Sequence, residues 1–194
     1  MNKIFIVSAV CMLAGCTTNI QPIANSVITA QPYIGLQERS HRSELKELLD
    51  VDPVRTEWCA AFVNSILEID NIPTLNDQTK YPPLMARSFL YWGDRVDPAD
   101  IKRGDVVIFP RGNAGWQGHV GFYVDTQVHD GKEYWIILGG NQSNEVRYDF
   151  YSPNRALGVR RWPVQTETRQ AQFLGLSIAP AIPTSYDGLE PTDD

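Results

Sequence analysis

The sequence predicts an α+β domain in which N-terminal helices pack on an antiparallel β-sheet. Between residues 43 and 92, apolar residues recur at helical spacing. From residue 105 onward, short runs of aromatic and β-branched residues are separated by turn residues. Helices that precede the strands, rather than alternating with them, are typical of the α+β class.

Three helices are expected in the first part of the domain. Residues 43–49 carry three leucines at helical spacing, and residues 85–92 form a short helix that ends at Gly93. Between these two segments, Thr56 is a favourable N-cap residue. Apolar residues then follow at positions i, i+3, i+4 and i+7 and turn one helical face toward a core: Cys59, Phe62, Val63 and Ile66.

Strands are expected in the second part, at residues 105–109, 119–126, 133–138 and 158–162. The two middle strands are joined through Asp130 and Gly131, and Asp-Gly is a strong signal for a two-residue hairpin turn. A glycine-rich loop at residues 111–118 precedes the first strand of this hairpin. The hairpin makes an antiparallel sheet the simplest arrangement.

The first residues have the pattern of an export signal. Lys3 precedes an apolar run over residues 4–14, which is too short to span a membrane because a spanning helix needs roughly 20 apolar residues. The run ends in Leu-Ala-Gly-Cys, which resembles the lipobox of bacterial lipoproteins. The resemblance implies removal of residues 1–15 and lipidation of Cys16, with an ordinary secretory signal as the alternative. By resemblance to lipoproteins of bacteria with two membranes, Thr17 rather than aspartate after the cysteine implies anchoring in the outer membrane, facing the periplasm.

Composition divides the rest of the chain. Residues 16–31 are polar and are expected to form a flexible spacer, residues 32–163 the folded domain, and residues 164–194 a largely disordered tail. The formal net charge is −6, and the basic residues are not clustered. Both features argue against a nucleic-acid-binding protein, which needs a basic surface.

Cys59 is the candidate catalytic cysteine. The chain has three cysteines, and Cys11 and Cys16 lie in the removed segment and at the lipidation site, so an intrachain disulfide is not expected. Near a helix N-terminus, unpaired backbone N–H groups and the helix dipole stabilise a thiolate, and we therefore expect a lowered pKa for Cys59. The alternative is that Cys59 is a small buried hydrophobic residue.

His119 is the candidate base for this cysteine. It opens a strand between glycines, whereas His41 and His129 lie in segments expected to be solvated. A third group must orient the imidazole. A tight turn at residues 130–131 places Gln142 opposite His119, and a one-residue bulge places Asn141 there. Asp125 is a weaker candidate, because it lies about 20 Å along the same strand.

Four ordered blocks, at residues 56–64, 103–109, 118–123 and 139–142, resemble the NlpC-type and CHAP superfamily of papain-like peptidases and amidases of bacterial cell walls. The nearest pattern is the subgroup with Trp-Cys-Ala-Ala-Phe-Val, Gly-His-Val-Gly and Gly-Gly-Asn-Gln. The resemblance implies a papain-like fold and a catalytic set in which Cys59 is the nucleophile, His119 the base and Asn141 the orienting residue. Glu57 departs from the subgroup, which more often has proline there.

By the same resemblance, the chain is expected to be a cysteine-dependent peptidoglycan hydrolase, an amidase or endopeptidase. Trp58, Trp116 and Gln142 are candidates for substrate binding, although either tryptophan is as easily a core anchor. Peptidoglycan and, through Cys16, the membrane are the expected partners, and the sequence suggests no metal or other cofactor. Two alternatives remain: a non-catalytic wall-binding envelope lipoprotein, and a related thiol acyltransferase.

Overall fold

The computed structural model of the chain describes residues 22–78, 80 and 82–163. The expected signal peptide, the lipidation site Cys16 and the C-terminal tail lie outside the described residues. Among the described residues, no helix combines the length and the apolar character that crossing a bilayer requires.

Helices form most of the N-terminal half. They are α1 Pro22–Ala30, α2 Arg42–Leu49, α3 Cys59–Ile69 and α4 Leu75–Gln78, with 3₁₀ helices η1 Gln31–Tyr33 and η2 Ala86–Tyr91. The strands follow: β1 Asp94–Val96, β2 Val106–Pro110, β3 Gly118–His129, β4 Lys132–Gln142, β5 Glu145–Tyr151 and β6 Gly158–Arg161. Two further 3₁₀ helices are η3 Pro98–Asp100 and η4 Pro153–Arg155. The expected segregation of helices from strands is confirmed.

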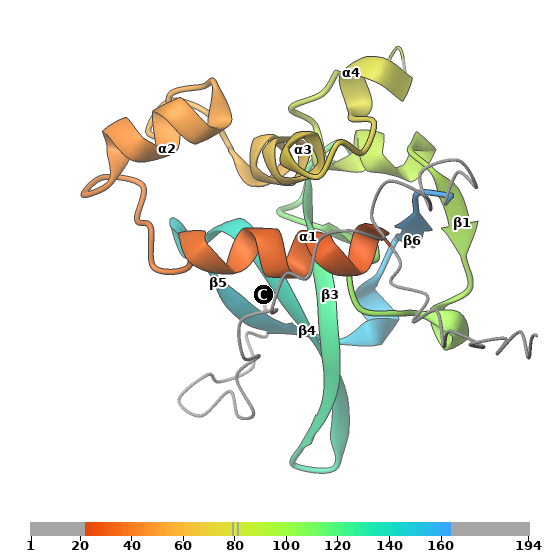
Figure 1. The fold of residues 1–194 in the computed structure, drawn as a ribbon. Helices are drawn as coiled ribbons and strands as arrows, with labels where there is room; N and C mark the ends of the chain where they lie inside the picture. Colours follow the sequence, from red (N-terminus) through yellow and green to blue (C-terminus); the bar gives the residue numbers. More distant parts are fainter. Residues whose placement is uncertain (1–21, 79, 81, 164–194) are drawn as a thin grey trace, which may run out of the picture.

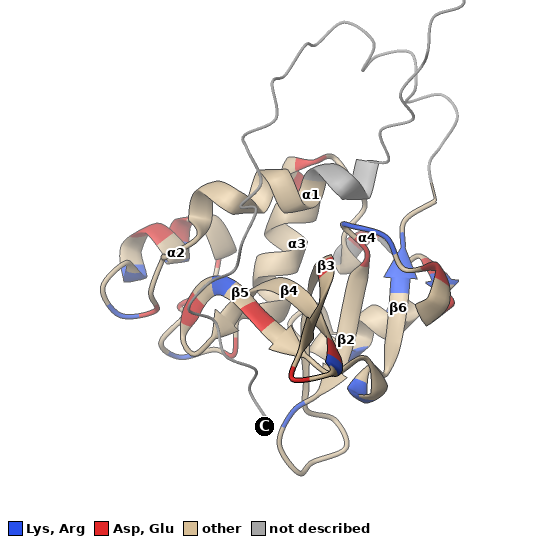
Figure 2. Cartoon of the chain, turned by 90° about the horizontal axis from the view of Figure 1, so that it is seen from below, with Lys and Arg blue, Asp and Glu red and all other residues tan. Residues whose placement is uncertain are grey.

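The six strands form one antiparallel sheet in the order β1-β6-β2-β3-β4-β5. Figure 1 shows α1 and α3 lying across the sheet, while the β3–β4 hairpin extends beyond the body of the domain. In Figure 2 the charged residues lie mainly on α2, on β5, at the end of β6 and in loops. The α+β class predicted from the sequence is therefore correct.

Alternating side chains give the sheet two apolar faces. Val106 and Ile108 of β2 belong to the larger core, which they share with α1 and α3. Val107 and Phe109 belong to a smaller cluster with residues of β3, β4 and β6. The helix that carries Cys59 therefore packs on one face of the sheet, against β3 and β4.

The β3–β4 hairpin has the predicted turn. His129 pairs with Lys132 across Asp130 and Gly131. A bulge then shifts the register by one residue between Tyr123 and Asp125. This is the one-residue bulge that the sequence analysis left open.

Helix α1 corrects the expected domain boundary, because it occupies residues assigned to the spacer. Val27 and Ala30 are fully buried in the main core. Ser26 and Thr29 donate hydrogen bonds of 2.5 Å and 2.6 Å to the two carboxylate oxygens of Asp70, at the end of α3. These contacts tie α1 to α3, so the folded domain begins before residue 32.

Strands β1 and β5 were not predicted. Strand β5 buries Val146, Tyr148 and Phe150, an alternation that the sequence already contains and that is typical of a half-buried strand. Strand β1 has only three residues, and pairing with β6 defines it. Asp105 is held by Arg161 of β6 at 2.6 Å, which supports a structural role for the Gly-Asp turn before β2.

Candidate active site

Cys59 is the first residue of α3. The N-cap residue is Trp58, with no side-chain capping bond, so the expected cap at Thr56 is wrong and the helix begins two residues later than expected. The Cys59 side chain is buried, and the backbone N–H groups of Val120 and Ala60 lie close enough to its sulfur to lower the pKa of the thiol. The thiol therefore sits where the helix N-terminus meets β3.

His119 lies one residue before Val120, at the start of β3, and is only 4% exposed. The contact between Val120 and the Cys59 sulfur places the two candidate catalytic residues on adjoining elements. Within the described chain, no hydrogen bond joins the thiol directly to the imidazole. Catalytic hydrogen bonds are often long in the absence of substrate.

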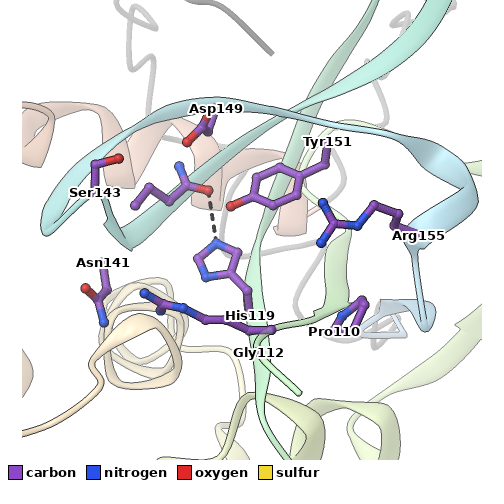
Figure 3. Close-up of a pocket in the computed structure, with 10 residues that line it drawn as sticks. Pro110, Gly112, His119, Asn141, Ser143, Asp149, Tyr151 and Arg155 are labelled. Atoms are coloured by element: carbon purple, nitrogen blue, oxygen red, sulfur yellow. Dashed lines mark hydrogen bonds between the residues drawn. The ribbon is translucent and has the colours of Figure 1, made fainter. Parts of the chain in front are cut away.

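Gln142 orients the imidazole. Its Oε1 lies 3.0 Å from His119 Nε2 (Figure 3). The Gln142 amide nitrogen donates to the carbonyl oxygens of Ile137 at 3.2 Å and Arg147 at 2.5 Å, which fixes the oxygen toward the ring. Because a carbonyl oxygen only accepts, Nε2 must carry the proton. Nδ1 is then the unprotonated nitrogen that can accept a proton from a nucleophile.

Asn141, the expected orienting residue, makes a different contact. Its Nδ2 donates to Glu57 Oε2 at 2.7 Å. The bulge in β3 gives the register that favours Asn141, but the backbone of Asn141 is left-handed, with φ 58°, and a second irregularity lies between Gly139 and Gln142. Because the backbone turns at Asn141, the side chain of Gln142 faces His119 and the side chain of Asn141 faces Glu57.

Two glycines make the arrangement possible. A Cβ on Gly139 would lie 3.2 Å from Gln142 Oε1 and 3.3 Å from His119 Nε2. A Cβ on Gly140 would lie 2.5 Å from the Trp58 ring and 2.7 Å from Phe62 Cβ. The Gly-Gly pair therefore lets β4 pass close beneath the His119–Gln142 contact and against the start of α3.

Burial keeps the candidate dyad neutral. It raises the pKa of the Cys59 thiol above its ordinary value, and the nearby Arg111 guanidinium and the two backbone N–H groups only partly offset this. Burial also lowers the pKa of His119 to about 4, although the hydrogen bond that the ring donates to Gln142 raises this pKa. The lowered thiol pKa expected from the helix position alone is therefore wrong for this structure, because desolvation outweighs the helix N-terminus.

Tyr151 is a site residue that the sequence analysis missed. Its ring stacks on His119, with centroids 5.5 Å apart and planes 11° apart, and also on Phe109 at 4.4 Å. It is the last residue of β5, so the alternation in that strand was the signal that could have located it. Tyr151 limits the movement of the imidazole on one side.

A cavity of about 130 Å³ opens beside His119. Arg111 and Arg155, neither of which the sequence analysis singled out, line it together with Asn141 and Tyr151. Figure 3 shows Arg155 directed toward Tyr151 from one side, and Asn141 on the opposite side. The cavity therefore borders the imidazole, whereas Cys59 is not among the residues that line it.

The two tryptophans differ in exposure. Trp58 is fully buried and its indole nitrogen lies 3.3 Å from Glu38 Oε2, so it anchors the core and does not present a surface for substrate. Trp116 is 65% exposed in the loop before β3 and remains available for binding. Glu57 is largely exposed and makes the smallest contribution to the pKa of Cys59.

The geometry of the site, rather than similarity to known proteins, is the main evidence for its chemistry. No protein-family model matches the chain, and a comparison with curated proteins found no match. In the described part of the chain, no group of three or more histidine, cysteine, aspartate or glutamate side chains is placed to hold a metal ion.

Proposed function

We propose that the domain is a papain-like cysteine hydrolase that cleaves an amide bond in peptidoglycan. The observation that carries the proposal is the buried Cys59 at the start of α3, beside a histidine whose Nε2–H is fixed by Gln142. A binding module needs neither a buried thiol at a helix N-terminus nor a fixed imidazole tautomer. The four sequence blocks that resemble cell-wall hydrolases indicate the substrate.

The first half of the proposed reaction forms a thioester. The Cys59 sulfur attacks the amide carbonyl carbon as its proton passes to His119 Nδ1. The backbone N–H of Cys59 at the helix N-terminus donates to the developing oxyanion. The imidazolium then protonates the leaving nitrogen and the C–N bond breaks. A His119 pKa of about 4 favours this second transfer and makes the first one the uphill step.

The second half releases the product. Neutral His119 takes a proton from water, the hydroxide oxygen attacks the thioester carbon, and the C–S bond breaks. The sulfur recovers a proton from the imidazolium, so Cys59 and His119 return to their starting states. Tyr151, stacked on the ring, and Gln142 keep Nδ1 in place throughout.

We further propose that Cys16 carries a lipid anchor and that the domain works in the periplasm, attached to the outer membrane. The Leu-Ala-Gly-Cys motif supports this. Anchoring would hold a negatively charged domain near its acidic polymer substrate at high local concentration.

Incubation of the protein with purified sacculi in H₂¹⁸O, followed by mass spectrometry of the soluble fragments, tests the proposal. Hydrolysis incorporates one ¹⁸O atom into each new carboxyl group, whereas transfer to an amine acceptor incorporates none. Cys59→Ser should reduce release by roughly 10³-fold or more. Val128→Ser, an exposed substitution at the hairpin tip, is the control and should release fragments at the wild-type rate. Full activity of Cys59→Ser would refute the proposal.

A further inference from the structure

The cavity beside His119 is flanked by two positive charges. Arg111 follows β2, and Arg155 is the last residue of η4. The positive charge of each arginine lowers the pKa of the Tyr151 hydroxyl, although burial raises this pKa by more. Arg111 also acts on Cys59 and His119. The two guanidinium groups therefore flank the volume that a substrate would occupy next to the imidazole.

The arginines differ in how far they are already paired. Arg111 Nη1 lies 3.1 Å from Glu57 Oε2. Arg155 makes no ion pair with any residue in the ranges that the structure describes, and in Figure 3 its guanidinium points toward Tyr151. Asp149 also lines the cavity, and its Oδ1 accepts a hydrogen bond of 3.0 Å from the Phe150 N–H. Arg155 thus offers donors that the described residues do not use.

Asn141 supplies a second, independent observation. Its side chain lines the cavity and is 4% exposed, and its Oδ1 is buried without a hydrogen-bond partner among the described residues. The hydrogen bond from Nδ2 to Glu57 holds the amide, so the oxygen cannot turn away without breaking that bond. Buried amide oxygens are normally paired. This oxygen therefore lacks an N–H donor, which a ligand would supply.

We infer that the cavity recognises a peptide substrate with a free carboxylate close to the scissile amide, bound by Arg155 together with Arg111, while a substrate N–H donates to Asn141 Oδ1. The inference rests on the proposed hydrolase function and narrows its substrate class. A carboxylate fits the planar donors of a guanidinium.

Chemical amidation of the substrate tests the inference. Muropeptides released from sacculi are compared with the same mixture after carbodiimide-mediated amidation with ammonia, which removes the carboxylate charges. Wild-type protein should cleave the untreated form with a kcat/KM roughly 10- to 100-fold higher, as expected for charge-assisted hydrogen bonds. Arg155→Gln should abolish most of that preference. Arg95→Gln, an exposed charge removal on edge strand β1, should keep it.

Binding separates this inference from the proposed reaction. Calorimetry with Cys59→Ala and both muropeptide forms should show tighter binding of the untreated form, and the double variant with Arg155→Gln should lose the difference. A binding preference without cleavage of either form would refute hydrolysis and keep the carboxylate site. Equal cleavage or equal binding of the two forms would overturn the carboxylate site and leave the hydrolase proposal standing. A preference that persists in Arg155→Gln would overturn the assignment to Arg155.

Discussion

The Nε2 atom of His119 lies 3.0 Å from Oε1 of Gln142, and this contact, rather than one with Asn141, fixes the imidazole. The Gln142 amide is held in turn by the carbonyl oxygens of Ile137 and Arg147. The orientation of the proposed base thus depends on backbone groups of β4 and β5. Loss of Gln142 frees the ring and also leaves the Nε2–H without its acceptor.

Gln142→Ala is therefore expected to reduce kcat for muropeptide cleavage by roughly 10- to 100-fold, a part of what general base catalysis provides. Asn141→Ala should raise KM more than it lowers kcat, because Asn141 contacts the cavity and Glu57 but not the ring. Gln127→Ala, on the same hairpin and distant from the site, is the matched control. A larger loss of kcat in Asn141→Ala than in Gln142→Ala would restore Asn141 as the orienting residue.

The burial of Cys59 predicts slow alkylation of the resting enzyme. Because desolvation raises the pKa of the thiol, the thiolate fraction at pH 6 is below that of a free cysteine. We expect the peptide that contains Cys59 to react with iodoacetamide more slowly in the folded protein than in urea-unfolded protein, as measured by mass spectrometry over time. Faster reaction in the folded state at pH 6 would indicate a preformed thiolate–imidazolium pair.

The lowered pKa of His119 predicts a loss of stability in acid. Below pH 6.5 His119 becomes protonated in the unfolded chain, whereas in the folded protein it stays neutral until about pH 4. The free energy of unfolding therefore falls as the pH drops from 6.5 to about 4. The difference corresponds to about 3 kcal/mol at full effect. Urea unfolding of wild type and His119→Gln between pH 7 and pH 4 measures it. The variant should show a shallower pH dependence, and parallel curves would contradict the shift.

The attachment of α1 through Asp70 can be tested by stability alone. Ser26→Ala removes one of two hydroxyl donors from a half-buried carboxylate whose pKa burial already raises. We expect the free energy of unfolding to fall by about 1–3 kcal/mol. Ser40→Ala, on the surface, should change it by less than about 0.5 kcal/mol. If the two variants unfold alike, the Ser26–Asp70 hydrogen bond does not stabilise the domain.

The proposed anchor makes its own prediction. Cells grown with a labelled fatty acid should incorporate label into the wild-type chain and not into Cys16→Ala. Cys11→Ala, which removes the neighbouring cysteine within the apolar run, should still be labelled. Equal labelling of wild type and Cys16→Ala would exclude lipidation at this residue.

Local sequence determined much of the fold. The leucines of residues 43–49 gave helix α2, the apolar spacing after Thr56 gave most of α3, and Asp130 with Gly131 gave the hairpin turn, because each signal acts over a few residues. The same local patterns predicted the class of fold and pointed to Cys59 and His119 as candidate catalytic residues. Strand β5 could also have been predicted, since the sequence shows the alternation of apolar and polar residues that is typical of a half-buried strand.

Tertiary structure alone decided the remaining features. Helix α1 lies in a segment that was expected to be a flexible spacer, and contacts with Asp70 and the core make it part of the domain. The left-handed backbone at Asn141 exchanged two neighbouring side chains, an effect that counting residues from the hairpin turn cannot capture. The pKa of Cys59 depends on burial by distant segments, which outweighs the helix N-terminus that the sequence places beside it. The sequence thus named the candidate reactive residues, and long-range packing set their partners and protonation states.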